Sequence, residues 1–434
     1  MADPGPLFLG IDVGTSGVRA CLLDQAGRRR GFSAVPLPPG RRSGTHSEQD
    51  PQAWWAALLA AVDGLAARQP LAAVAALALD ATAATLLATD ARGRPLGPAL
   101  MYDDRRAGDA AERVLAVAPG DPRDPAAAAL GPSAGLAKWL WLRAHHPGAR
   151  ILHQADWLIG RLLGGRFGIT DAHTALKTGY DPVRRTWPDW VRALAGTGLP
   201  RVHAPGTPLG RLAPDLARRW KMTGPPWVAA GTTDSTAAVL ATGVQAAGEA
   251  VTVLGSTLVL KVASPRPIFF APGGVYSHRL PDGLWLAGGA SNSGGRVLAQ
   301  HFSPEEIERL GRRIDPRRPL CLEYYPLPGP GERFPVADPE LPPRLTPRPR
   351  DEARFLQGLL EGMARIERLG YRRLAALGAP APTRVVSLGG GARNDVWRAI
   401  RQRRLGVPVT LAREQEAACG AARLARLAWR EVQR

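Results

Sequence analysis

The sequence has few cysteines and no long apolar run. Its three cysteines lie far apart, at positions 21, 321 and 419 of 434. None has the spacing of a zinc site or of a disulfide framework, so we expect neither, and a reducing cytoplasm is the natural setting. The apolar stretches are short and interrupted by glycine, arginine or aspartate, which excludes a helix that spans a membrane. No basic segment precedes the first apolar run, which argues against a secretory signal.

Lysine is also scarce, because only four of the 56 basic residues are lysines and the rest are arginines. The formal net charge of +18 would suit a nucleic acid or an anionic surface as partner. However, the arginines are spread along the chain and accompany much alanine, glycine and proline, as in proteins of GC-rich genomes. We therefore expect no nucleic-acid partner, although a nucleic-acid-associated protein stays open on charge alone.

Strand and helix patterns predict an α/β chain of two domains, which its length of 434 residues also favours. Residues 7–24 have the pattern strand, glycine turn, strand, and a third strand is expected at 31–35. A helix with one apolar face at 54–67 and a buried strand at 74–80 follow. Residues 249–262 repeat the strand–turn–strand pattern, which indicates two lobes of like topology.

Further segments complete this outline. Residues 85–96 predict another strand–turn–strand unit around a glycine turn. Residues 326–350 are rich in proline and arginine and are expected to be largely irregular. A long helix is predicted at 355–377, and a last helix at 414–432 carries small residues that suit close packing.

Turns rich in glycine and hydroxyl side chains follow apolar strands at four places. They lie at residues 12–17, 231–236, 255–257 and 389–394. Such turns let backbone N–H groups approach phosphate oxygens closely. An aspartate at a strand end, such as Asp12, can hold magnesium through water. An aspartate that opens a helix, such as Asp234, is favoured in the ionised form that a general base requires.

Each turn has an ordinary structural explanation as well. Asp12 and its glycines would suit a plain hairpin, and Asp234 would suit a helix N-cap. The last turn competes with a dinucleotide-binding fingerprint, but Asn394 stands where that motif ends in glycine. No GxxxxGK[ST] loop occurs, which disfavours ATPases of that type. Taken together and in this order, the four turns favour function over coincidence.

The ordered motifs resemble the FGGY family of carbohydrate kinases, in the superfamily of hexokinase, glycerol kinase and actin. The matching segments cover nearly the whole chain, at 10–16, 231–235, 255–257, 288–295, 331–335 and 389–394. The resemblance implies two ribonuclease-H-like α/β domains that face a central cleft. A sugar-binding and catalytic domain is expected at 1–241 and a nucleotide-binding domain at 242–412, with a final helix at 413–434 that packs back on the first domain.

Within the family, some segments look closest to the D-ribulose kinase branch, often labelled xylulose-kinase-like. They lie at 154–158, 175–180, 202–206 and 274–278. The resemblance therefore implies that D-ribulose becomes D-ribulose 5-phosphate, with Asp234 as general base and Mg-ATP between the domains. The alternatives are D-xylulose or another ketose or polyol as substrate, and an actin-like protein that binds ATP without transfer. We expect a monomer or homodimer that binds ATP, Mg²⁺ and the sugar, with no membrane partner.

Site residues are carried over position by position from this resemblance. The expected magnesium ligands are Asp12 and Asp234. The expected sugar contacts are Thr15, Thr82, Asp104, Asp234 and Ser235. The expected nucleotide contacts are Thr15, Ser16, Gly255, Ser256, Thr257, Gly294, Gly295, Gly390, Gly391 and Asn394.

The chain departs from the family pattern at residues 80–85. Xylulose kinases usually carry a Met-His-Gly element there, whose histidine touches sugar, and that histidine is absent. The ribulose branch tends to carry Gly-Thr-Ser-Gly, and Ala83 replaces the serine expected to contact sugar. Tyr102 stands in the tryptophan place of a Trp-Asn-Asp-Gln-Arg element. Within that element, Asp104 is either a sugar contact or part of a surface charge cluster.

Overall fold

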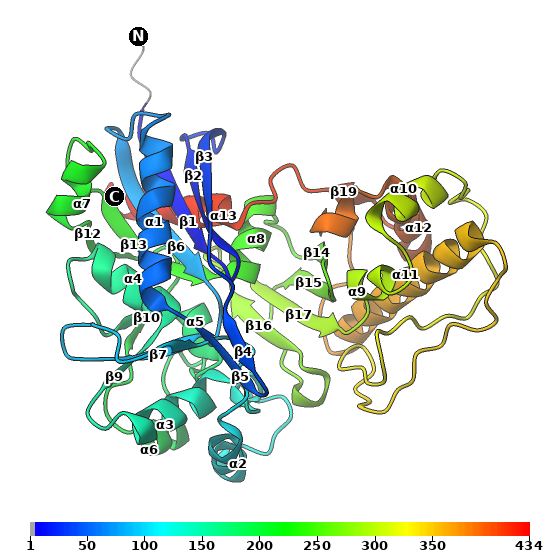
Figure 1. Cartoon of the computed structure of the whole chain (residues 1–434), viewed down its shortest axis with the longest axis horizontal. Coiled ribbons are helices and arrows are strands. Elements are labelled where there is room, and N and C mark those ends of the chain that lie inside the picture. Colours follow the sequence, from blue (N-terminus) through cyan, green and yellow to red (C-terminus); the bar gives the residue numbers. More distant parts are fainter. Residues whose placement is uncertain (1–4) are drawn as a thin grey trace. The chain divides into compact units, whose positions relative to one another are not determined.

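The computed structural model describes residues 5–434, and the chain divides into two compact units (Figure 1). Unit 1 holds the described residues up to Gly120 together with Ala128–Gly243 and Glu416–Arg434. Unit 2 holds Asp121–Ala127 and Val244–Gln415. None of the helices within the described part of the chain has the length and apolar character needed to cross a membrane.

Unit 1 is built on a six-stranded mixed sheet of order β12-β13-β6-β1-β2-β3. Its strands are β1 (Leu7–Val13), β2 (Gly17–Leu23), β3 (Arg29–Pro36), β6 (Val74–Ala81), β12 (Pro208–Arg211) and β13 (Trp227–Thr233). Strands β1, β2 and β3 are antiparallel neighbours, whereas β6 runs parallel to β1 and β13 runs parallel to β6. The carboxyl ends of β1, β6 and β13 therefore lie at one edge of the sheet.

A second sheet of order β4-β5-β8-β7-β9 and the pair β10-β11 complete the strands of unit 1. Their bounds are β4 (Arg41–Ser43), β5 (His46–Gln49), β7 (Leu86–Thr89), β8 (Ala99–Leu100), β9 (Arg150–His153), β10 (Ile169–Asp171) and β11 (Arg201–His203). The helices are α1 (Pro51–Ala66), α2 (Gly108–Val117), α3 (Gly135–His145), α4 (Gln154–Leu162), α5 (Ala172–Leu176), α6 (Asp189–Ala195), α7 (Pro214–Arg219), α8 (Asp234–Thr242) and α13 (Ala417–Val432).

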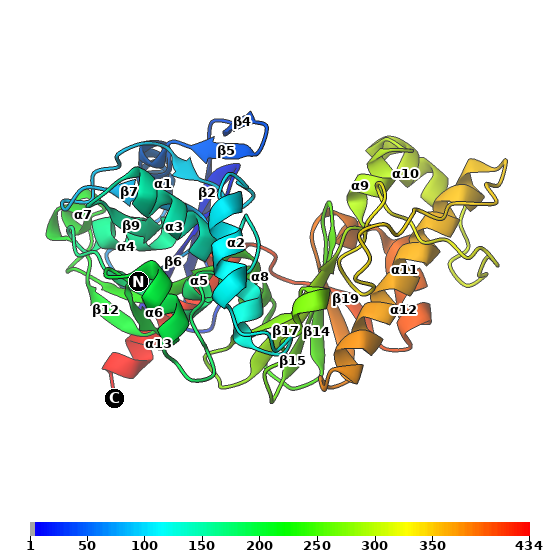
Figure 2. The ribbon, with the colours of Figure 1, turned by 90° about the horizontal axis from the view of Figure 1, so that it is seen from below.

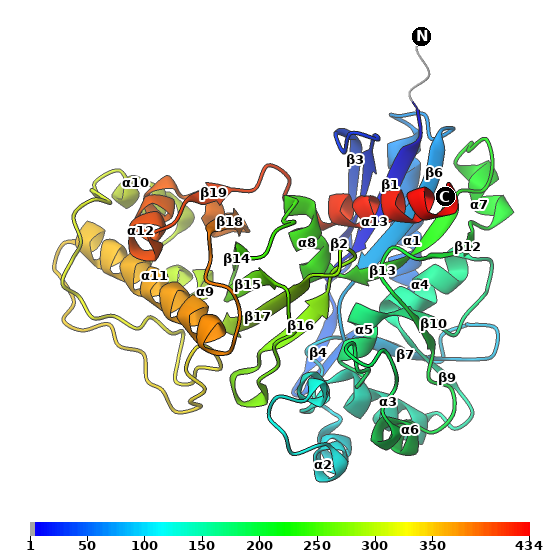
Figure 3. The ribbon, with the colours of Figure 1, turned by 180° about the vertical axis from the view of Figure 1, so that it is seen from behind.

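The main sheet of unit 1 is covered on both faces. Residues of α1 and α4, including Trp54 and Trp157, join one apolar cluster with alternate residues of β1 and β6. The other alternate residues of these strands pack against α13, which lies across them (Figure 3). A Cβ atom at Gly10 would lie 1.8 Å from the carbonyl oxygen of Ala418. Only glycine at this position lets α13 lie so close to β1.

The last helix begins at Ala417, three residues later than the predicted start at 414. Its small residues pack closely, as the sequence predicted. A Cβ atom at Gly420 would lie 1.8 Å from the carbonyl oxygen of Ala237 on α8. The end of the chain therefore forms part of the core of unit 1.

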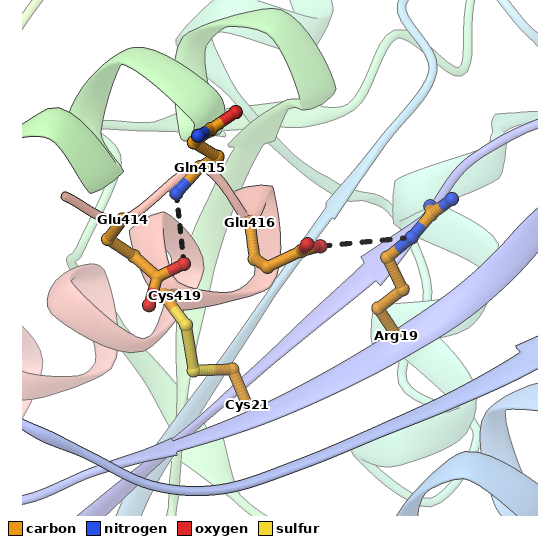
Figure 4. The surroundings of a disulfide bond; sticks show 6 residues. All are labelled: Arg19, Cys21, Glu414, Gln415, Glu416 and Cys419. Carbon is orange, nitrogen blue, oxygen red and sulfur yellow. Dashed lines mark hydrogen bonds and ion pairs between the residues drawn. A yellow bond between two sulfur atoms is a disulfide. The ribbon is translucent and has the colours of Figure 1, made fainter. Parts of the chain in front are cut away.

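A disulfide bond between Cys21 on β2 and Cys419 on α13 ties these two elements together (Figure 4). The expectation that the cysteines are unpaired was wrong. The two residues are 398 positions apart, so spacing alone could not show that α13 returns to the sheet. The remaining cysteine, Cys321, is free and exposed. The cytoplasmic location stays a prediction.

Unit 2 contains a six-stranded sheet of order β16-β17-β15-β14-β18-β19. Its strands are β14 (Glu249–Leu254), β15 (Leu258–Ser264), β16 (Tyr276–Arg279), β17 (Trp285–Ser291), β18 (Arg384–Leu388) and β19 (Val409–Leu411). Its helices are α9 (Gly295–Ala299), α10 (Pro304–Gly311), α11 (Glu352–Ala376) and α12 (Asp395–Leu405). Helices α11 and α12 lie side by side and share one apolar core with the sheet (Figure 2).

Five strands of each unit share one topology, which confirms the prediction of two lobes of like topology from the repeated pattern. In unit 2, β14, β15 and β17 are antiparallel neighbours, and β18 and β19 continue in parallel on the other side of β14. This order matches β1, β2 and β3 followed by β6 and β13 in unit 1. Each unit adds one antiparallel edge strand, β12 or β16.

Most local predictions are confirmed, with one exception. The hairpins at 7–24 and 249–262 and the helices at 54–67 and 355–377 are present. The predicted unit at 85–96 has only its first strand, since the second is reduced to a single bridge between Thr89 and Pro95.

Candidate active site

Three aspartates meet at one edge of the main sheet of unit 1. Asp12 on β1 lies directly opposite Asp80 on β6, and Thr232 on β13 pairs with Asp80 from the other side. Asp234 follows β13 as the first residue of α8. The parallel alignment of these strands therefore brings the predicted base and magnesium ligand beside a third carboxyl group, to which the sequence analysis gave no role.

Asp80 is fully buried, and no N–H or hydroxyl group among residues 5–434 donates to its carboxyl group, which instead interacts with the carboxyl group of Asp12. Burial and the negative charges of Asp12 and Asp234 raise the pKa of Asp80 well above its usual value. Asp80 therefore keeps its proton over a wider pH range than an ordinary aspartate.

Arg19 is a site residue that sequence reasoning missed. It lies opposite Asp12 in the hairpin, and its Nη1 donates to Asp12 Oδ2 at 2.9 Å. Its Nε lies 3.9 Å from Glu416 Oε2, just before α13 (Figure 4). Hairpin pairing could have revealed this neighbour of Asp12, because the predicted turn fixes which residues face each other.

The turn between β1 and β2 holds the predicted phosphate contacts Thr15 and Ser16, and both are exposed. Gly14 N donates to Gly17 O at 3.1 Å and closes the turn. Gln49 Nε2 donates to Thr15 O at 2.8 Å and holds the turn from the side. The turn is therefore fixed in place, with its two hydroxyl-bearing residues at the surface.

Two predicted sugar contacts lie next to the aspartates. Thr82 comes two residues after Asp80 and is 6% exposed. Ser235 directly follows Asp234, and its main-chain N donates to Asp234 Oδ1 at 2.6 Å. Unit 1 thus brings Thr82 and Ser235 to the edge where Asp12 and Asp234 lie.

Asp104 is fully buried, so a role in a surface charge cluster is excluded. Its Oδ2 accepts from Ser47 N at 2.6 Å and from Arg106 Nη2 at 2.8 Å. Arg106 also donates to Glu48 at 2.7 Å. Protein donors already occupy the Asp104 carboxylate, and its contact with sugar stays a prediction.

Lys138 on α3 is a further residue that the sequence analysis left without a role. It is fully buried, and its Nζ donates to Ala84 O at 2.6 Å and to Met101 O at 2.7 Å. Burial lowers the pKa of Lys138 to about 7. Ala84 has a φ of 56°, a conformation that non-glycine residues rarely adopt. Lys138 therefore helps to hold the turn that follows Thr82.

In unit 2, two of the predicted nucleotide-binding turns are bonded to each other. Gly295 N donates to Gly255 O at 2.8 Å, and Arg296 N donates to Ser256 O at 3.2 Å. A Cβ atom at Gly294 would lie 2.9 Å from Ser256 O, and the φ of Gly294 is 143°. Glycine at 294 is thus needed for the two turns to meet.

The third predicted nucleotide-binding turn lies beside the end of β14. A Cβ atom at Gly389 would lie 2.7 Å from Leu254 O, and the residue has a φ of 84°. Gly390 and Gly391 follow in a 3-10 turn that leads into α12. Asn394 Oδ1 accepts from Trp397 N at 2.9 Å and caps this helix. The cap uses one end of the Asn394 amide, and its contact with adenosine stays a prediction.

Glu332 anchors the turn after β17, although the sequence analysis assigned it no role. Its carboxylate accepts from Ser291 Oγ at 2.5 Å and from Asn292 N at 2.8 Å. Asn292 Nδ2 donates to Gly331 O at 2.9 Å. These bonds fix the segment that leads to Gly294. The 331–335 motif therefore helps to position the predicted nucleotide-binding turn at 294–295.

Within the described residues, no group of three or more histidine, cysteine, aspartate or glutamate side chains is arranged to hold a metal ion. Magnesium that arrives with a nucleotide needs less, because one or two carboxylates, water and phosphate oxygens complete its shell. Asp12 and Asp234 fit this limited requirement.

Two units of like topology, each with glycine turns at its strand ends, define an actin- or hexokinase-like fold. The description "FGGY family of carbohydrate kinases, N-terminal domain" matches residues 7–241, and the corresponding C-terminal domain matches residues 250–429. The chain belongs to the FGGY family of carbohydrate kinases.

The similar proteins include xylulose kinases, gluconate kinases and glycerol kinases. The chain is 28% identical to a xylulose kinase of Escherichia coli over 415 residues, which cover 90% of this chain and 83% of the relative. It is 29% identical to a xylulose kinase of Streptomyces coelicolor, with coverage of 97% and 88%. The solved structure of a "xyloylose kinase" from Brucella ovis has a TM-score of 0.86 at 27% identity and covers 98% of this chain and 91% of that one.

Proposed function

We propose that this carbohydrate kinase transfers the terminal phosphoryl group of ATP to a hydroxyl of D-ribulose, with Asp234 as general base. The observation that carries the proposal is the meeting of Asp12 and Asp234 around buried Asp80 at one sheet edge. Arg19 offsets the charge of Asp12 at 2.9 Å. Asp234 opens α8, where the helix dipole favours the ionised carboxylate that accepts a proton.

The nucleotide belongs to unit 2 in this proposal. The three glycine turns around Gly255, Gly294 and Gly390 offer backbone N–H groups and hydroxyls to phosphate oxygens. Asp12 and Asp234 would hold magnesium, which neutralises negative charge on the phosphates when bound. The role of the chain is mainly positioning, because phosphoryl transfer has a loose transition state that needs little covalent help.

Two sugars compete as the substrate. D-ribulose is favoured because residues 80–85 lack the sugar-contacting histidine that xylulose kinases usually carry there, and because several segments resemble the ribulose branch. D-xylulose is the second candidate, because both curated relatives described above are named xylulose kinases. Either sugar is a pentulose, so the proposed roles of Asp234 and of the glycine turns are the same for both.

The test is ADP release measured over D-ribulose, D-xylulose, L-ribulose, ribitol and glycerol, with the wild type and Asp234→Asn. We expect a pentulose-dependent rate that Asp234→Asn lowers by about 10²–10⁴-fold, the range for loss of a general base. Asp189→Asn is the matched control, because Asp189 also opens a helix of unit 1 and is exposed. Turnover of Asp234→Asn near the wild-type rate refutes the base, and preference for D-xylulose overturns the sugar.

A further inference from the structure

One buried glutamine, Gln154, forms hydrogen bonds with the turn that follows β6. Gln154 is the first residue of α4 and is fully buried. Its side-chain Oε1 lies 3.1 Å from Thr82 N and 2.6 Å from Thr82 Oγ1. Its main-chain N donates to Thr85 O at 2.9 Å. Gln154 therefore contacts both ends of the turn that contains the predicted sugar contact Thr82.

These contacts fix the orientation of the Gln154 amide. The main-chain N–H of Thr82 can only donate, so the amide atom that faces it must be the accepting oxygen. The amide nitrogen Nε2 then points away from Thr82. It is buried and has no hydrogen-bond partner within the part of the chain that the structure describes.

The same contacts fix the direction of two hydroxyl protons. Because Gln154 Oε1 only accepts, the hydroxyl of Thr82 must donate its single proton to it. Thr82 Oγ1 also lies 2.6 Å from Thr85 Oγ1, and Thr85 must therefore be the donor in that bond. Thr82 Oγ1 is left with one lone pair and no proton, so it can only accept a further hydrogen bond.

Accessibility distinguishes Thr82 from the two residues behind it. Gln154 and Thr85 are 0% exposed, whereas Thr82 is 6% exposed. Of these three residues, only Thr82 has surface that a ligand can touch. A partner for its remaining lone pair must bring a proton, as a sugar hydroxyl does and a carbonyl or ether oxygen does not.

We propose that Gln154 is a positioning residue that makes Thr82 an obligate hydrogen-bond acceptor, so that this subsite selects a substrate hydroxyl and rejects a carbonyl oxygen. The proposal rests on the proposed function, because it takes Thr82 to contact the sugar. It adds that the ketone oxygen of a pentulose binds elsewhere in the site.

The unpartnered amide nitrogen supports a functional role for Gln154. A buried donor without a partner destabilises the fold, so packing alone would favour an apolar side chain of similar size. Gln357 in unit 2 provides a contrast, because it is 6% exposed and its Nε2 donates both to Arg318 O at 2.6 Å and to Glu361 Oε1 at 3.1 Å. Gln357 is therefore a matched glutamine with a structural role only.

The test compares Gln154→Met, Thr82→Val and the double variant on the best pentulose substrate. Each single change should raise the KM for the sugar by about 3–10-fold, the loss expected for one neutral hydrogen bond, and leave the KM for ATP unchanged. Gln154→Met should add little when Thr82 is already valine, because its effect passes through the Thr82 hydroxyl. Gln357→Met should lower the thermal midpoint without changing the KM for the sugar.

Substrate analogues test the polarity directly. A fluorine atom cannot donate, so replacing the hydroxyl that faces Thr82 with fluorine should weaken binding to the wild type by about 3–10-fold. In Gln154→Met the Thr82 hydroxyl is free to turn, and this discrimination should fall. If Gln154→Met does not fold, Gln154→Glu retains an acceptor facing Thr82 and should retain the discrimination.

The outcomes separate this inference from the proposed function. Additive effects in the double variant, or equal changes in both KM values, overturn the role of Gln154 while pentulose turnover and its dependence on Asp234 persist. If no pentulose is phosphorylated by the wild type, the proposed function itself is wrong.

Discussion

Unit 2 buries an ion pair whose charged atoms all have partners, whereas unit 1 buries a carboxyl group that faces other carboxyl groups and an amide nitrogen that has no acceptor. In unit 2, Arg401 donates to both carboxylate oxygens of Glu367 at 2.7 Å and to Ser387 Oγ at 2.7 Å. In unit 1, Gln154 Nε2 has no partner among the described residues, and the Asp80 carboxyl group has no donor beyond the neighbouring carboxyl group of Asp12. Both groups are equally removed from water, so the difference lies in pairing.

The difference shows which polar groups support the fold and which are kept for chemistry. A fully paired buried group contributes little net stability, but removing one partner is costly. An unpaired buried group destabilises the fold from the start, and such groups often mark functional sites. The Arg401–Glu367 network lies under α11 and α12, whereas Asp80 and Gln154 lie in the unit that carries Asp234 and Thr82. Within the described residues, unit 2 also holds buried atoms without partners, at Ser293, His301, Trp397 and Arg404, so the contrast concerns these two networks and not the whole units.

Breaking the paired network should have the largest effect on stability. Arg401→Met leaves the Glu367 carboxylate buried without its counter-ion, and we expect the free energy of unfolding to fall by about 3–5 kcal/mol. Arg398→Met on the same helix is the matched control, because its ion pair with Asp395 is largely exposed and should contribute about 1 kcal/mol or less. Urea unfolding of both variants measures the difference, and similar losses would contradict the comparison.

Removal of the disulfide in unit 1 should have the next largest effect on stability. The bond joins β2 to α13 in the unit that contains Asp80 and Gln154. Cys419→Ser should lower the free energy of unfolding by about 2–5 kcal/mol, the usual cost of losing a native disulfide. Dithiothreitol should destabilise the wild type to a similar degree and leave Cys419→Ser unchanged. Cys321→Ser serves as control, since Cys321 is exposed and forms no disulfide bond. If dithiothreitol does not change the urea midpoint of the wild type, the disulfide bond does not form in solution.

What the sequence could predict depends on how far apart the contacting residues are. The hairpins around Asp12 and Gly255 follow from local patterns of apolar residues and glycine, and both are present. The pairing of Cys21 with Cys419 was missed, because it depends on the path of the whole chain between them. The sequence predicts roles for Asp12 and Asp234, and the fold brings both beside Asp80.

The supporting residues were harder to predict than the aspartates. Gln154 lies in a segment that resembles the ribulose branch, and Asp80 ends a predicted strand. The sequence assigns a role to neither residue, because burial and hydrogen-bond partners are visible only in three dimensions. The turn at residues 12–17 is formed by neighbouring residues, so its pattern is visible in the sequence. The contact of Gln154 with Thr82 joins residues 72 positions apart. Local sequence therefore indicated the reacting groups, and the fold was needed to find the groups that orient them.

Titration of Lys138 should give the smallest of these effects, as a dependence of stability on pH. Burial lowers its pKa from 10.5 to about 7, so between these values the unfolded chain binds more protons than the folded chain. The free energy of unfolding should therefore rise with pH across this window, by about 2–3 kcal/mol from about pH 6.5 to about pH 9. Lys138→Met should lack this rise, while Lys221→Met, at an exposed lysine, should keep it. Urea unfolding at the two pH values measures it, and an equal rise in the wild type and Lys138→Met would show that the buried amine is not the group that titrates.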